Sequence, residues 1–316
     1  MMKLTEKNKI ILLTILAGII GVIIFILIYG IQVLDTTNDT WLYSNDDLTQ
    51  QHIGWVFFRK ADWNAKIGTF NTLSYPNYAS IIYTDSIPLF AIFFKSISGI
   101  LPETFQYIGI YGLLCYILQG VFAFTLLRKF IKNKLYCIVG TVFFIISPYL
   151  MQRMFWHTAL SSHFLILAAL CLFAYRDIYK KKPIKKVILW NTLLFCAVTI
   201  HLYFVPMLLI IMLSTFIAEY IENKKTYASS GLTIAVFLII TLFTILILGG
   251  TTSEKLAYSG LGYYNINLNT FFNPQGNSTF LKDLNIATLG EYEAIGYLGA
   301  RHIINVLFRF ILCFTK

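Results

Sequence analysis

Acidic residues and histidines gather at a few points between the apolar stretches of this 316-residue sequence. Carboxylates and imidazoles at a membrane–water boundary can accept a proton from a hydroxyl group and can bind an anionic ligand. Ionisable groups close to a membrane interior are costly and for that reason often mark functional sites. Residues selected by this criterion come from four separate parts of the chain: Asp46, Asp47, Asp85, His157, His163 and His201.

Neighbouring residues could extend this chemistry. Arg59, beside Lys60, offers a guanidinium group that can hold a phosphate. Tryptophans either provide flat faces for sugar rings or form the aromatic belt typical of a membrane interface; they are Trp41, Trp55, Trp63 and Trp156.

The candidate residues also have purely structural interpretations. Asp46 and Asp47 suit a turn, and Asp85 suits a helix cap before the Ser-Ile-Pro that follows it. Arg59 could extend its charge from an apolar surface toward water, and the histidines could be hydrogen-bonded members of a helix bundle. The residue types alone leave both interpretations open.

The elements that must position these residues are strongly apolar. The chain is 57% hydrophobic and 13% charged, with a mean hydropathy of +0.69, whereas a soluble domain is nearer a quarter charged. Its apolar blocks are long enough to cross roughly 30 Å of hydrocarbon. The sequence therefore predicts an all-α membrane protein with about eight spans, at 10–33, 105–127, 135–151, 159–175, 187–203, 205–221, 231–250 and 296–314.

We expect one transmembrane domain over 1–316, divided into a first span (1–33), an outer loop carrying membrane-surface helices (34–102), a helical bundle (103–250), a second outer loop (251–295) and a last span (296–316). The apolar segment 86–102 is short and contains Lys95, so a helix on the membrane surface is favoured. The alternative, a full span there, would invert every later loop. The end at Lys316, directly after an apolar run, leaves open that the protein is longer.

Basic residues predict the orientation. Lysines and arginines concentrate near the N-terminus and in 128–134, 176–186 and 224–225, and cytoplasmic loops carry such an excess. We therefore expect a multi-pass protein of the cell membrane with a cytoplasmic N-terminus. The net charge of +10 is divided among these short clusters, which argues against a nucleic-acid partner.

Other classes of site are not indicated. The cysteines Cys115, Cys137, Cys171, Cys196 and Cys313 lie inside apolar blocks without CxxC spacing, so we interpret them as small buried side chains. The sequence contains no phosphate-binding loop, HExxH or GxSxG motif. Oxygen ligands from Asp46, Asp47 and Asp85 are compatible with a divalent cation, and the cofactor is otherwise unknown.

Several motifs resemble a known family. The pattern D-x-x-Q-x-H-I-G-W-x-F-F-R ends at Arg59 and precedes T-D-S-I-P-L-F, and the later pieces are S-P-Y-L-x-x-R, H-T-A-L-S-S-H-F, N-x-F-F-N-P-Q-G and E-Y-E-A-I-G-Y-L-G. Together they resemble a bacterial polytopic family of unknown function that is grouped with the GT-C glycosyltransferases. The resemblance extends from about residue 10 to 300.

This resemblance implies transfer of a sugar from a polyprenyl-phosphate donor to a cell-envelope glycan or lipid-linked acceptor at the outer membrane face, with membrane lipid as a further partner. It places the catalytic base on Asp46 or Asp47 and a second acid or metal ligand on Asp85. We expect the substrate to be bound by His52, Arg59, His157, His163 and His201. The competing hypotheses are a transporter or flippase of envelope lipids and a non-catalytic assembly protein; the absence of a sequence repeat favours the enzyme.

Overall fold

The computed structural model describes residues 5–251, 266–276, 278–285, 290–291 and 296–297. The chain divides into two compact units, Met1–Ser253 and Glu254–Lys316. The described part of the second unit contains a single helical turn, Leu268–Phe271. The first unit holds every predicted site residue. Besides short 3₁₀ helices, it contains α1 (Glu6–Tyr29), α2 (Asp46–Lys60), β1 (Thr69–Phe70), β2 (Ala79–Ser80), α3 (Pro88–Ser96), α4 (Ile108–Phe130), α5 (Lys134–Ile145), α6 (Pro148–Arg153), α7 (Phe164–Ala174), α8 (Pro183–Ile200), α9 (Phe204–Glu222) and α10 (Tyr227–Ile247).

The described part of the chain has six helical stretches that are long and apolar enough to cross a membrane, which agrees with a helical membrane protein. They are Glu6–Tyr29, Ile108–Phe130, Lys134–Arg153, Pro183–Ile200, Phe204–Glu222 and Lys224–Ile247. A further apolar stretch, Thr158–Ala174, is shorter. The six long stretches match six of the predicted spans, and the shorter stretch lies at the predicted span 159–175. The eighth, 296–314, lies outside the described residues except for its first two positions, so the count of eight stays a prediction.

The ambiguous segment 86–102 contains only the nine-residue helix α3. At 1.5 Å per residue this helix is about 14 Å long, less than half the thickness of the hydrocarbon layer. The structure therefore favours the non-spanning interpretation. Lys95 in this helix is only 5% exposed, and its ammonium lies 4.1 Å from the ring centre of Phe58 and 4.5 Å from that of Trp63. The two rings compensate for part of the cost of burying the charge.

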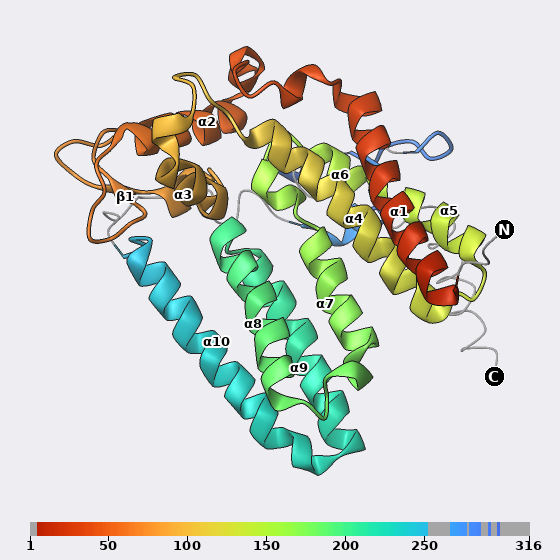
Figure 1. Cartoon of the computed structure of the whole chain (residues 1–316). Helices are drawn as coiled ribbons and strands as arrows, with labels where there is room; N and C mark the ends of the chain where they lie inside the picture. The colour runs from red at the N-terminus through yellow and green to blue at the C-terminus, as the bar shows by residue number, and fades with distance from the viewer. Residues whose placement is uncertain (1–4, 252–265, 277, 286–289, 292–295, 298–316) are drawn as a thin grey trace. The chain divides into compact units, whose positions relative to one another are not determined.

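Helices α1 and α4 pack closely against each other (Figure 1). The contact depends on a glycine, because a Cβ atom at Gly21 would lie 2.4 Å from the backbone oxygen of Tyr116 in α4. The hydroxyls of Tyr29 and Tyr116 are hydrogen-bonded at 3.0 Å near the end of the same contact. This pairing brings the segment after α1 next to the start of α4.

Helices α8, α9 and α10 form a second group. A buried ion pair joins them: Lys186 Nζ lies 2.5 Å from Glu219 and donates a 2.7 Å hydrogen bond to Ser230. Neither charged side chain is exposed. The lysine that the sequence assigns to a cytoplasmic cluster is therefore a buried link between three helices.

The segment between α1 and α4 folds onto the ends of the long helices (Figure 1). Its two-residue strands pair in antiparallel fashion, with Thr69 opposite Ser80. Ser80 donates a 2.7 Å hydrogen bond to the backbone oxygen of Leu248 at the end of α10, and Tyr83 donates one of 2.6 Å to that of Gly250. Hydrogen bonds thus tie the predicted outer loop to the last described helix of the bundle.

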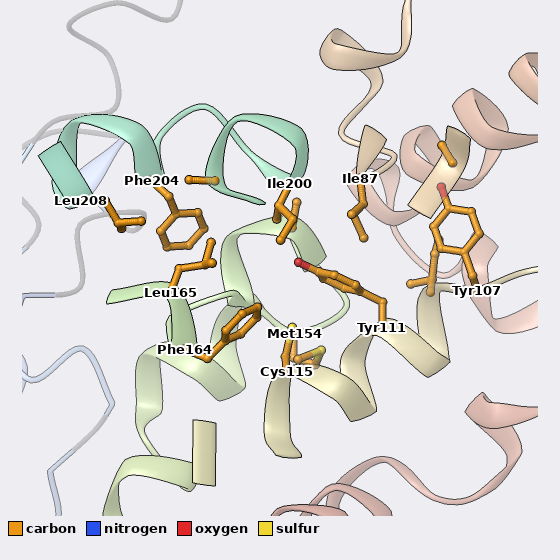
Figure 2. Packing of buried hydrophobic residues seen from close by; sticks show 14 of the residues in the cluster. Ile87, Tyr107, Tyr111, Cys115, Met154, Phe164, Leu165, Ile200, Phe204 and Leu208 are labelled. Carbon is orange, nitrogen blue, oxygen red and sulfur yellow. The ribbon is translucent and has the colours of Figure 1, made fainter. Parts of the chain in front are cut away.

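A continuous core runs from this loop into the bundle. Figure 2 shows Ile87 and Tyr107 of the loop region in one cluster with Phe164, Ile200 and Phe204 from the helices. Cys115, Cys137 and Cys171 are buried, as predicted, and Cys196 is partly buried; all four are free thiols. Cys313 lies outside the described residues.

The α1–α4 contact generates a prediction about stability. Gly21→Ala should lower the thermal unfolding temperature of the purified protein by several degrees, because overpacking typically costs about 1–3 kcal/mol. Unfolding can be followed in detergent with a thiol-reactive dye that reports exposure of the buried cysteines. Gly18→Ala is the matched control, since its Cβ would meet only side chains, at 3.4 Å or more. Equal unfolding temperatures for both variants would contradict the proposed constraint.

Candidate functional site

Helix α2 carries two of the three predicted acids, Asp46 and Asp47, and the motif that ends at Arg59. Asn45 caps it by accepting a 2.9 Å hydrogen bond from the Leu48 backbone. Asp46 and Asp47 occupy the first turn, where a carboxylate interacts favourably with the helix dipole. Two of the buried residues of the helix, Gln51 and His52, are polar; the others are Leu48, Gly54, Trp55 and Phe58.

A strained turn, residues 84–87, lies against this helix. Asp85 and Ile87 have φ angles of 56° and 52°, a region that is unfavourable for a β-branched residue such as Ile87. Gly54 permits the close approach, because a Cβ there would lie 2.4 Å from Thr84 Cβ. Ser86 donates a 2.7 Å hydrogen bond to the backbone oxygen of Gln51 and its own carbonyl accepts one from Tyr107. The surrounding contacts therefore hold the turn in a conformation that it would not favour alone.

Gln51 links this turn to a third segment. Its Nε2 donates to Asp85 Oδ2 at 3.1 Å and to the backbone oxygen of Trp156 at 3.2 Å. Gln51 is 1% exposed. Asn45, the N-cap of α2, donates a 3.1 Å hydrogen bond to the backbone oxygen of Phe155. Two amide side chains thus bring α2, the Asp85 turn and residues 155–156 together.

His201 completes the surroundings of Asp85. Its Nε2 lies 3.5 Å from Asp85 Oδ1. Its Nδ1 accepts a hydrogen bond from the backbone N–H of Tyr203, so the neutral ring carries its proton on Nε2, facing the carboxyl group. Both side chains are 20% exposed. Asp85 Oδ1 accepts no hydrogen bond within the described residues.

Asp47 and His157 form the solvent-facing side of the same site. Asp47 Oδ2 lies 3.6 Å from His157 Nε2, and the two side chains are 48% and 26% exposed. His157 follows the strained Phe155, whose φ is 60°. The structure therefore brings together four of the six polar residues that the sequence analysis selects: Asp47, Asp85, His157 and His201.

Burial sets the protonation of this site. It raises the pKa of Asp85 from 3.8 to about 7, and the nearby negative charge of Asp47 adds to the increase. Burial lowers the pKa of His201 to about 4, so its ring is neutral at pH 7. A carboxyl group that titrates near pH 7 is well suited to general acid–base catalysis.

The other predicted residues lie elsewhere. Asp46 is exposed on the first turn of α2. His52 is on a different side of the helix and contacts Asp39 at 3.3 Å. Arg59 holds the segment after α3: its Nε donates to Ser98 Oγ at 2.8 Å and its Nη1 to the Glu103 backbone at 2.9 Å. Because these hydrogen bonds occupy its N–H groups, the Arg59 guanidinium has few donors left for a phosphate.

His163 lines an apolar pocket of about 480 Å³ between α6, α7 and α9. Arg153 is the pocket's only permanent cation among the described lining residues, and the walls include Leu160, Phe204 and Met207. Tyr203 also lines it, and its ring centre lies 4.7 Å from that of His201. The pocket therefore begins beside the Asp85 site.

A cation site has no support from the geometry of these acids. The described residues include no group of three or more His, Cys, Asp or Glu side chains that could hold a metal ion. Asp47 and Asp85 come close enough to interact.

Two residues of the site, Gln51 and Arg153, were not among those predicted from the sequence. Gln51 was detectable as the one polar position in the apolar stripe 48, 51, 55 and 58 of α2. Arg153 belongs to the S-P-Y-L-x-x-R motif, but only the fold places it near His163.

The fold and this site define a helical membrane protein with an acidic site built at the ends of its helices. Residues 18–316 match the family model described as "Domain of unknown function (DUF6311)", and the chain belongs to that family. No curated protein and no solved structure matches the chain.

The electrostatics of Asp85 can be tested without an activity assay. Asp47→Asn should lower the pKa of Asp85, because it removes a neighbouring negative charge. The pKa can be measured by NMR titration of protein labelled at aspartate ¹³Cγ, with the signal assigned by its loss in Asp85→Asn. Asp46→Asn is the control and should leave the titration unchanged. A pKa near 4 in the wild type, or equal shifts in both variants, would refute the arrangement.

Proposed function

We propose that this protein is a GT-C-type glycosyltransferase that moves a sugar from a polyprenyl-phosphate donor to a hydroxyl group of a cell-envelope acceptor at the outer membrane face. The observation that carries the proposal is the position of Asp85: a carboxyl group only 20% exposed, beside an apolar pocket that contains a cation, where burial raises its pKa to about 7. The motif resemblance to GT-C enzymes supports the same reaction.

Asp85 acts as the general base in this proposal, and Asp47 raises its pKa. This differs from the sequence-based assignment of the base to Asp46 or Asp47, because both of those side chains are far more open to water. A hydrogen bond from Gln51 orients the Asp85 carboxyl group, and the His201 ring lies 3.5 Å from its other oxygen. His157 stands beside Asp47, where the acceptor would enter from the aqueous side.

The apolar pocket suits the donor. Its walls match an isoprenoid chain, and Arg153 and His163 offer hydrogen-bond donors to the phosphate. In the reaction, the acceptor oxygen bonds to the anomeric carbon of the sugar and its proton passes to the Asp85 carboxylate. The bond between that carbon and the phosphate oxygen breaks, and its electron pair leaves with the polyprenyl phosphate.

A transporter or flippase is the competing hypothesis. Such proteins typically place ionisable residues near the middle of the membrane. Here the buried pair Lys186–Glu219 lies in the first turn of α8 and the last turns of α9, close to helix ends. This position favours a structural link over a substrate pathway, so the enzyme is the better-supported proposal.

The proposal predicts loss of transfer in Asp85→Asn. A deletion strain complemented with this variant should lack a sugar in its envelope glycan and accumulate the lipid-linked donor. With purified protein, the transfer rate should fall about a hundredfold or more, the usual effect of removing a general base. In the wild type the rate should rise with pH, with a midpoint near 7, because the base must be deprotonated.

Asp46→Asn is the matched control, since it removes an exposed acid one residue from Asp47 and should preserve transfer. Full restoration of the glycan by Asp85→Asn would eliminate Asp85 as the base. Unchanged glycans and lipid pools in the deletion strain itself would favour one of the non-enzymatic alternatives.

A further inference from the structure

A second pocket lies on the side of α2 that carries His52 and Arg59. Its volume is about 420 Å³, within the range of small-molecule sites. Residues of the loop before α2, of α2 itself and of the segment after α3 line it: Asp39, Tyr43, His52, Trp55, Val56, Arg59, Lys60, Ser98, Glu103, Thr104 and Phe105. All of these belong to the predicted outer loop or directly follow it.

The walls of the pocket are held rigidly. The four hydrogen bonds of Arg59 fix residues 98–103, and the Trp55 indole donates a 2.8 Å hydrogen bond to the Phe105 backbone. Such clamps keep a binding site in one conformation before the ligand arrives, which lowers the entropic cost of binding.

His52 leaves an unused hydrogen-bonding atom in this setting. The side chain is 1% exposed, and its Nε2 faces Asp39 Oδ2. Burial lowers the pKa of His52 despite that carboxylate, so the neutral ring donates through Nε2 and its Nδ1 is an acceptor. Within the described residues Nδ1 has no hydrogen-bond partner. A buried acceptor of this kind costs free energy when it is left unpaired.

The charged residues that line the pocket favour a neutral ligand over an anionic one. Asp39 and Glu103 balance Arg59 and Lys60, so the lining has no net positive charge for a phosphate. Carboxylates accept hydrogen bonds from sugar hydroxyls, and Tyr43, 54% exposed, offers an aromatic face for a sugar ring. These features fit a neutral polyhydroxyl compound better than an anion.

We propose that this pocket binds a neutral sugar unit of the acceptor glycan, away from the reacting hydroxyl. The assignment to the acceptor rests on the proposed transferase function. In that proposal the donor's phosphate and isoprenoid chain occupy the apolar pocket that contains Arg153 and His163, which leaves the present pocket for the acceptor. The pocket would thereby select the glycan while Asp85, on a neighbouring side of α2, carries out the chemistry.

The test uses the full chain in lipid nanodiscs and neutral oligosaccharides released from the envelope polysaccharide of the native host. Saturation-transfer NMR and calorimetry should detect binding to the wild type. Tyr43→Ala should weaken it about tenfold, the order expected from losing an aromatic contact. Tyr78→Ala, which removes an exposed tyrosine outside the pocket, is the matched control and should bind as the wild type does.

Two further measurements separate the possible failures. The Asp85→Asn variant should bind the oligosaccharides as the wild type does. If it also restored the glycan fully in cells, the proposed transferase reaction would be disproved, whereas the proposal that the pocket binds a sugar would stand. Inorganic phosphate should not displace the oligosaccharides. Absence of wild-type binding, equal effects of Tyr43→Ala and Tyr78→Ala, or displacement by phosphate would each overturn the inference, whatever the fate of the proposed reaction.

Discussion

The site depends on one side-chain amide. The Gln51 side chain donates simultaneously to the carboxyl group of Asp85 and to the Trp156 backbone, while the backbone oxygen of Gln51 accepts a hydrogen bond from the Ser86 hydroxyl. These bonds join three segments that lie far apart in the sequence. Because the amide is buried, leaving either of its donors unpaired would cost more than the bond itself contributes. The strained turn at Asp85 and Ile87 persists because these contacts over-determine it.

Helix α2 then separates two chemical environments. On one side lies a carboxyl group whose burial brings its pKa near neutrality, beside an apolar pocket suited to a lipid. On another side lies a charge-balanced polar pocket suited to a sugar. A transferase between a lipid-linked donor and a glycan needs both environments close together, and a helix lying across the ends of the spanning helices supplies that arrangement.

Much of this architecture was predictable from the sequence. Hydropathy located seven apolar helices, and the rule that ionisable residues are costly near a membrane identified Asp85, His157 and His201. Long-range packing decided the rest. The sequence shows neither that Arg59 fastens a loop nor that Lys186 is buried against Glu219, because polar residues near span ends look alike whether they face water or one another. The amide of Gln51 became important only once Asp85 and Trp156 were placed beside it.

The most direct test of the account is an experimental structure of the chain in nanodiscs with a synthetic polyprenyl phosphate, determined by cryo-electron microscopy with a bound antibody fragment. We predict phosphate density between Arg153 and His163, with the isoprenoid chain along Phe204 and Met207 and the phosphate opening toward Asp85. A phosphate bound away from this pocket, or an Asp85 carboxyl group separated from Gln51 and His201, would contradict the central claim that these segments build one transfer site.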